Sequence, residues 1–152
     1  MKRPGRRRDR RMMGRAFQLA RLNHGLTGKN PSVGCLILDA RGHIAGAGVT
    51  GTGGAPHAEE VALDEAAGKA AGGTAYVTLE PCRERSSGAP SCARKLVEAG
   101  IARVVVAIED PHPTARDGLA ILREAGVRVE TGLGKYTAAR LYRAFFAATK
   151  GS

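Results

Sequence analysis

The chain has 152 residues and a formal net charge of +10, and it is long enough to fold as one domain around its own hydrophobic core. No apolar run approaches the roughly 18 residues of a membrane span, and the N-terminus lacks the apolar core of a secretory signal. We therefore predict a cytoplasmic protein with no membrane contact.

The positive charge is concentrated at the N-terminus. Between Met1 and Arg15, eight basic residues accompany the single Asp9, so seven of the ten net charges lie in fifteen residues. Such a segment attracts polyanions such as nucleic acid, but no aromatic residue is interleaved with the arginines for base stacking. We interpret residues 1–12 as a flexible, solvated arm and keep nucleic acid as the less favoured partner.

The first half of the chain beyond the arm predicts a helix, a hairpin and a second helix. Apolar residues recur at helical spacing over residues 16–22 and stop at an Asn-His-Gly sequence. Two short apolar runs at 33–38 and 44–49 predict a hairpin with a buried first strand. A Gly-rich loop then leads into a helix that we expect to run from His57 to about Ala71.

The second half alternates strands with helices. We expect strands at 75–79, 104–108 and 127–131, because these runs are short and apolar or β-branched. The alternation predicts an α/β fold, a three-layer α/β/α sandwich around a central five-stranded mixed sheet, formed by one domain over residues 13–150. The helices expected in this half cover 92–99, 119–125 and 136–148.

Two of the three cysteines, Cys82 and Cys92, bound a polar loop of nine residues. They could form a disulfide, bind one metal ion or be unrelated thiols. A disulfide is the least favoured, because the cysteine count is odd and a reducing compartment favours metal or catalytic sites. Cys35 lies in an apolar strand and is predicted to be a core residue.

Polar residues at two helix openings suggest a metal site. His57 and Glu59 open one helix, and Cys82 and Cys92 flank the opening of another, where the helix dipole favours thiolates. One imidazole and two thiolates suit Zn²⁺ and leave a fourth position for water, whose pKa the ion lowers. Glu59 is placed to carry protons in a hydrolytic deamination. Zinc deaminases combine a His-x-Glu motif with Pro-Cys and a further Cys, although here the cysteine spacing is longer.

Four segments carry a more specific resemblance: Asn30–Gly34, Gly54–Glu59, Thr74–Cys82 and Asp110–Pro113. They resemble the cytidine deaminase superfamily, and most closely the pyrimidine deaminase domain of riboflavin biosynthesis, over about residues 13–146. Members of that branch place a long loop containing Gly, Pro and Ser between their zinc cysteines. Deaminases of tRNA adenosine and of free cytidine keep a two-residue spacing, so the long loop favours the riboflavin branch.

The resemblance implies a fold, a cofactor, a substrate and residue roles. The fold would be cytidine-deaminase-like, the cofactor Zn²⁺, and the substrate 2,5-diamino-6-(5-phosphoribosylamino)pyrimidin-4-one, whose 2-amino group is hydrolysed. By the same resemblance His57, Cys82 and Cys92 would bind zinc, Glu59 would move protons, and Asn30 would hold the pyrimidine.

The sequence departs from the family pattern at further substrate positions. Thr50 stands where a His is common, His112 replaces the usual Asn of a turn, and the loop lysine expected near the substrate phosphate has no clear counterpart. Arg83 or Arg85 could replace this lysine, because the guanidinium fork suits phosphate. We include Thr50, His112 and both arginines among the predicted substrate contacts.

The resemblance also implies partners. The family domain is usually followed by an NADPH-dependent reductase, and no such domain is present in these 152 residues, so the reductase is expected as a separate polypeptide or as a missing part of a longer chain. A homo-oligomer is expected as well. Two alternatives stay open: a nucleic-acid base deaminase acting on tRNA adenosine or on cytosine, and a non-catalytic zinc-binding scaffold.

Overall fold

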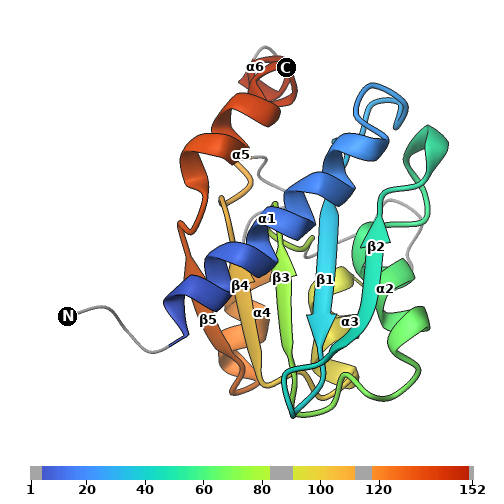
Figure 1. Ribbon diagram of the computed structural model, residues 1–152. Helices are drawn as coiled ribbons and strands as arrows, with labels where there is room; N and C mark the ends of the chain where they lie inside the picture. The colour runs from blue at the N-terminus through green and yellow to red at the C-terminus, as the bar shows by residue number, and fades with distance from the viewer. Residues whose placement is uncertain (1–4, 83–90, 112–117, 151–152) are drawn as a thin grey trace.

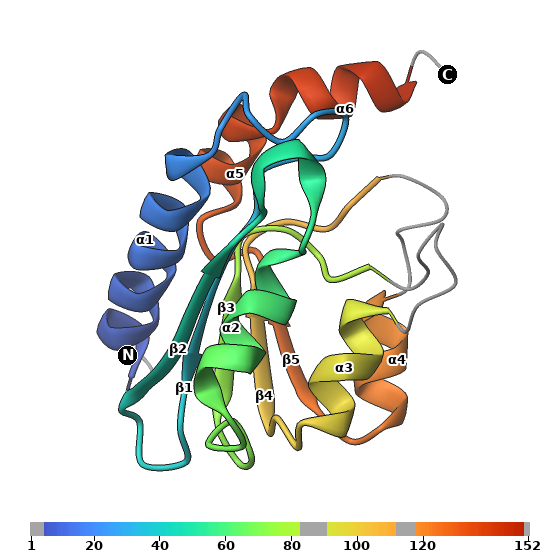
Figure 2. The ribbon, with the colours of Figure 1, turned by 90° about the vertical axis from the view of Figure 1, so that its right-hand side faces the viewer.

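The computed structural model describes residues 5–82, 91–111 and 118–150, which form a sheet with helices on both faces (Figures 1 and 2). This arrangement confirms the three-layer α/β/α sandwich predicted from the sequence. In chain order the described elements are α1 (Arg6–Leu22), β1 (Gly34–Leu38), β2 (Ile44–Val49), the short 3-10 helix η1 (Thr52–Gly54), α2 (Ala58–Ala66), β3 (Thr74–Val77), α3 (Cys92–Glu98), β4 (Arg103–Val106), α4 (Gly118–Glu124), β5 (Arg128–Thr131), α5 (Lys135–Leu141) and α6 (Arg143–Lys150).

The sheet is mixed and has five strands in the order β2-β1-β3-β4-β5. Strand β1 pairs antiparallel with both β2 and β3, whereas β3, β4 and β5 are parallel. Helices α2, α3 and α4 cover one face, and α1 and α5 cover the other (Figure 2). The segments that follow β3 and β4 therefore leave the sheet at the same edge.

Alternating side chains of the strands supply two hydrophobic cores. In β1, Cys35 and Ile37 point into the core shared with α2, α3 and α4, whereas Leu36 and Leu38 point into the core shared with α1 and α5. This alternation is the period of two that a strand imposes. Cys35 is fully buried, which confirms its prediction as a core residue.

Two glycines let α2 pack directly on β2. A β-carbon on Gly46 would lie 2.1 Å from the carbonyl oxygen of Ala62, and one on Gly48 would lie 2.2 Å from that of Ala58. Any side chain at these positions would force the helix away from the sheet. The glycines thus allow the first turn of α2, which directly follows His57, to lie against β2.

The structure differs from the predicted flexible arm over residues 6–12, because α1 already begins at Arg6. Asp9 accepts hydrogen bonds from the Tyr76 hydroxyl (2.6 Å) and from Nη1 and Nη2 of Arg103 (3.0 and 2.7 Å). Arg103 also donates to both carboxylate oxygens of Glu130 (3.1 and 2.8 Å). These partners are remote in the sequence, so local composition gave no sign that the segment is anchored.

Two helix ends also differ from prediction. The helix expected to reach about Ala71 ends at Ala66, because Ala67 adopts a left-handed conformation with φ of 48°. The single helix expected over 136–148 is divided into α5 and α6 at Tyr142. The Tyr142 hydroxyl donates to the carbonyl oxygen of Ser32 (2.8 Å) and lies 2.6 Å from the hydroxyl of Thr78, so this break accompanies a buried tertiary contact.

Within the part of the chain that the structure describes, no helix has both the length and the apolar character needed to cross a membrane.

We expect Asp9→Asn to destabilise the protein in a pH-dependent way. Burial raises the pKa of Asp9, but hydrogen bonds from Arg103 and Tyr76 outweigh it, so the pKa lies below its usual value. A depressed carboxyl pKa contributes stability that is present above about pH 4 and is lost as the pH falls through the folded-state pKa. The substitution should lower the free energy of unfolding by about 1–3 kcal/mol at pH 7, and less at pH 3.

Urea denaturation of both proteins at the two pH values measures this difference. Arg11→Gln, on an exposed position of the same helix, is the control and should change stability little. An Asp9→Asn defect of equal size at pH 7 and pH 3 would contradict the assigned charge interaction.

Candidate metal and catalytic site

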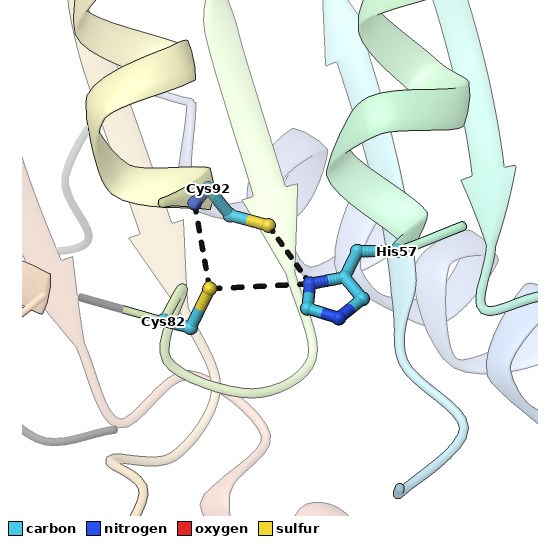
Figure 3. A group of neighbouring side chains, drawn as sticks. All are labelled: His57, Cys82 and Cys92. Carbon is cyan, nitrogen blue, oxygen red and sulfur yellow. Dashed lines mark hydrogen bonds between the residues drawn. The ribbon is translucent and has the colours of Figure 1, made fainter. Parts of the chain in front are cut away.

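Three side chains from separate segments converge at one edge of the sheet (Figure 3). His57 is the N-cap of α2, Cys82 lies beyond the end of β3, and Cys92 is the first residue of α3. His57 Nδ1 lies 3.1 Å from Cys92 Sγ and 3.9 Å from Cys82 Sγ. The backbone N–H of Cys92 also donates to Cys82 Sγ at 3.4 Å, so the three side chains form one compact cluster.

The cluster has the donor set and spacing of a zinc site. One ligand atom from each of the three residues lies within 4.8 Å of the others. A tetrahedral zinc ion with typical bond lengths separates a nitrogen ligand from a sulfur ligand by about 3.6 Å. The two observed nitrogen–sulfur separations, 3.1 and 3.9 Å, lie on either side of that value. The residues therefore fit a zinc ion with one further position open to water.

Capping and backbone bonds fix where α3 begins relative to Cys82. Ser91 is buried and its hydroxyl accepts a hydrogen bond from the backbone N–H of Arg94 (3.1 Å), as an N-cap does. The backbone N–H of Ala93 donates to the carbonyl oxygen of Cys82 (3.2 Å). Cys92 is thereby held as the first helical residue next to Cys82.

The pKa shifts of the two thiols have opposite directions. A hydrogen bond with Cys92 lowers the pKa of Cys82 to about 4, against an opposing effect of burial and with further help from His57. The same hydrogen bond, with burial, raises the pKa of Cys92. The contact between the two thiols thus favours the charged form of Cys82 over that of Cys92.

Glu59 lies beside this cluster and is almost completely buried, with 4% of its surface exposed. Burial, followed by the negative charge of Cys82, raises the pKa of Glu59 to about 7. A carboxyl group with a pKa near neutrality can both accept and release a proton. These properties are compatible with the proton transfer predicted for Glu59, which stays a prediction.

Two of the predicted substrate-contact residues, Asn30 and Thr50, lie within the described residues, and their surroundings differ. The Asn30 amide donates to the carbonyl oxygen of Gly54 (3.1 Å), in the loop that leads to His57. Thr50 is buried, and its hydroxyl accepts a hydrogen bond from the backbone N–H of Val33 (2.9 Å). The structure thus places Asn30 next to the loop entering the site, and it pairs the Thr50 hydroxyl, just after β2, with the residue before β1. Arg83, Arg85 and His112 lie outside the described residues.

Glu80 is a polar residue of this region to which the sequence analysis gave no role. Its carboxylate is buried and accepts hydrogen bonds from the backbone N–H groups of Asp110 (3.1 Å) and Leu119 (3.4 Å). It connects the segment leading to Cys82 with the segment after β4 and with the start of α4. A glutamate directly after an apolar strand was a usable signal, because a buried carboxylate requires partners.

The arginine-rich segment lies at the opposite edge of the sheet. A hollow of about 1310 Å³ there is lined by the first residues of β3, β4 and β5, which are Thr74, Arg103 and Arg128, whereas Cys82 follows the other end of β3. None of His57, Cys82 and Cys92 lines it. Its other basic lining residues are Arg6, Arg8, Arg10, Arg41 and Lys135.

Comparison with known proteins supports the assignment of a zinc site. Residues 6–108 match the family model described as the cytidine and deoxycytidylate deaminase zinc-binding region. This match includes all three candidate ligands and Glu59.

Individual relatives are similar over most of the chain. The riboflavin biosynthesis protein RibD of Escherichia coli is 44% identical over 90% of this chain and 37% of its own length. The diaminohydroxyphosphoribosylamino-pyrimidine deaminase of Buchnera aphidicola is 41% identical over 88% of this chain and 90% of its own length. The chain thus spans little more than a third of the first relative but nearly all of the second.

One solved structure is also similar over most of this chain. The diaminohydroxyphosphoribosylaminopyrimidine deaminase/5-amino-6-(5-phosphoribosylamino)uracil reductase of Thermotoga maritima superimposes with a TM-score of 0.88 and 32% identity. The superposition covers 94% of this chain and 41% of that chain.

We expect the purified protein to bind one zinc ion per chain through these three residues. Cys92→Ser should weaken zinc binding by at least about 100-fold, because losing a direct ligand costs more than the 10–100-fold loss typical of an outer-shell partner. Competition with a chromophoric chelator measures the affinity. Cys35→Ala, which alters a thiol buried in the core, should keep wild-type affinity. Unchanged affinity in Cys92→Ser would remove Cys92 from the site.

Proposed function

Because the chain belongs to the cytidine and deoxycytidylate deaminase family, we propose that it is a zinc-dependent hydrolytic deaminase of riboflavin biosynthesis. Its substrate is 2,5-diamino-6-(5-phosphoribosylamino)pyrimidin-4-one. The single observation that carries the proposal is the convergence of His57, Cys82 and Cys92 next to the buried Glu59. The family match confirms the resemblance predicted from the sequence.

The relatives support the choice of substrate. The Buchnera protein, which this chain matches over 90% of its length, is named as a deaminase of a diaminohydroxyphosphoribosylaminopyrimidine. The Thermotoga protein combines that activity with reduction of 5-amino-6-(5-phosphoribosylamino)uracil. A uracil is the product expected when water replaces the 2-amino group of the pyrimidine.

The proposed chemistry assigns proton transfer to Glu59. Bound to His57, Cys82 and Cys92, zinc would supply an activated water by lowering its pKa. Glu59 takes the proton of that water and passes it to the ring nitrogen next to the reacting carbon. As the water oxygen bonds to that carbon, the second proton of the water stays on the new hydroxyl group. Glu59 takes this proton and passes it to the 2-amino group, so the carbon–nitrogen bond breaks, ammonia leaves and a carbonyl remains. One carboxyl group can serve both transfers, and its burial, which raises its pKa, favours the protonated form that donates.

The substrate contacts belong to the same proposal. Asn30 already donates to Gly54, and its carboxamide oxygen would accept a hydrogen bond from the pyrimidine edge. Arg83 or Arg85 would contact the phosphate, and His112 the ribose. Thr50 would need to donate its hydroxyl proton to the substrate while its oxygen still accepts from Val33.

Partners follow from the relatives and the resemblance. Because the Thermotoga relative joins deaminase and reductase activities in one chain, we propose that a reductase consumes the product, either as a separate polypeptide or within a longer chain. A homo-oligomer and a cytoplasmic location complete the proposal.

The alternatives have less support. A nucleic-acid base deaminase needs phosphate contacts near its reacting base, whereas Arg6, Arg8 and Arg10 of α1 line the hollow at the edge of the sheet opposite to the site. A non-catalytic zinc scaffold assigns no role to Glu59, which is buried beside the three candidate ligands.

Glu59→Gln should keep zinc and lose turnover. Removing a general acid–base group typically lowers the rate by about 10²–10⁴-fold, and the amide preserves the shape of the side chain. Ammonia release from the proposed substrate by zinc-loaded protein gives the rate. Glu65→Gln, an exposed position on the same helix, is the matched control. Absence of turnover in the zinc-loaded wild type would exclude this substrate, and full activity of Glu59→Gln would exclude the role of Glu59.

The combined variant Arg7→Gln, Arg11→Gln and Arg15→Gln tests the nucleic-acid alternative. These side chains are exposed on α1, so their removal should change deamination of the small substrate by less than about twofold while weakening any salt-sensitive RNA binding. Deamination of an RNA oligonucleotide by the wild type, lost in the variant, would favour the alternative instead.

A further inference from the structure

An ion pair joins the two helices that carry metal ligands. Lys95 Nζ of α3 lies 2.7 Å from Glu60 Oε2 of α2. The side chains are only 28% and 19% exposed, so water screens their attraction less than in a fully exposed pair.

The same carboxylate also contacts the backbone of a candidate ligand. Glu60 Oε1 accepts a hydrogen bond from the backbone N–H of His57 at 3.2 Å. Its two oxygens therefore connect the residue that begins α2 with the side chain of α3.

Lys95 lies one helical turn beyond Cys92. Its own backbone N–H donates to the carbonyl oxygen of Ser91 (3.0 Å), so it belongs to the first turn of α3, which the Ser91 cap holds. Glu60 and Lys95 thus form a short connection between His57 and Cys92 outside the ligand side chains themselves.

The apolar contacts near these helix starts bury α2 and α3 against the sheet, and the ion pair adds a directional link between the two helices. The first residue of α2 is Ala58 and the second of α3 is Ala93; both are buried in the shared core. Small apolar side chains pack without a preferred direction, whereas a charged pair with an added backbone bond prefers one geometry.

We propose that Glu60 and Lys95 are positioning residues of the metal site, which hold the starts of α2 and α3 at the separation that brings His57 and Cys92 to one ion. The inference rests on the metal site proposed above. It assigns the pair no contact with substrate and no proton transfer.

The test compares Lys95→Met with Lys95→Arg. The first removes the pair and keeps the aliphatic stem, and the second keeps the charge. Glu130→Gln, which weakens the ion pair with Arg103 at the other edge of the sheet, is the matched control. The readouts are zinc affinity by chelator competition, the ligand-field absorption of bound Co²⁺, and the urea midpoint of the metal-free protein.

We expect Lys95→Met to weaken zinc binding by about 10–100-fold, the range found for outer-shell partners, and to change the Co²⁺ absorption. Lys95→Arg should restore both to near wild type, and Glu130→Gln should alter neither, even if its urea midpoint falls. Wild-type zinc affinity and Co²⁺ absorption in Lys95→Met would overturn the positioning role.

A parallel measurement on Cys92→Ser separates the two proposals. If Cys92→Ser loses zinc while Lys95→Met keeps it, only the positioning role fails. If Cys92→Ser also keeps zinc, the metal site itself is misassigned and the positioning role fails with it.

Discussion

The close contact between α2 and β2 is the constraint on which the site depends. Gly46 and Gly48 carry no side chain, and a β-carbon on either would lie about 2 Å from a backbone oxygen of the helix. The helix can therefore lie directly on the sheet. Its first turn brings His57 and Glu59 to the edge where the chain leaves β3 toward Cys82. A larger residue in β2 would displace the helix that carries both His57 and Glu59.

Around this contact, buried polar groups are fixed by backbone hydrogen bonds. Glu80 accepts from two backbone N–H groups, and Ser91 caps the helix that begins with Cys92. Burial also raises the pKa of both Glu80 and Glu59. The low-polarity surroundings strengthen the hydrogen bonds that hold the segments in place. They also raise the pKa of Glu59 toward the range that the proposed proton transfer requires.

Charge is divided between the two edges of the sheet. The thiols, His57 and Glu59 lie at one edge, and Arg6, Arg8 and Arg10 of α1 line the hollow at the other. Asp9 anchors the basic helix to Arg103, so these residues are part of the folded domain. Within the described residues, the hollow lined by these arginines is therefore separate from His57, Cys82 and Cys92.

The sequence by itself determined the alternation of strands and helices, the core position of Cys35 and the cluster of His57, Cys82 and Cys92, because these follow from local periodicity and short motifs. Only the tertiary structure decided the early start of α1, the break at Tyr142 and the pairing of Glu60 with Lys95. Each of these depends on a partner between 35 and 110 residues away. A local pattern shows that a residue can form an ion pair or a hydrogen bond, but the folded chain selects its partner.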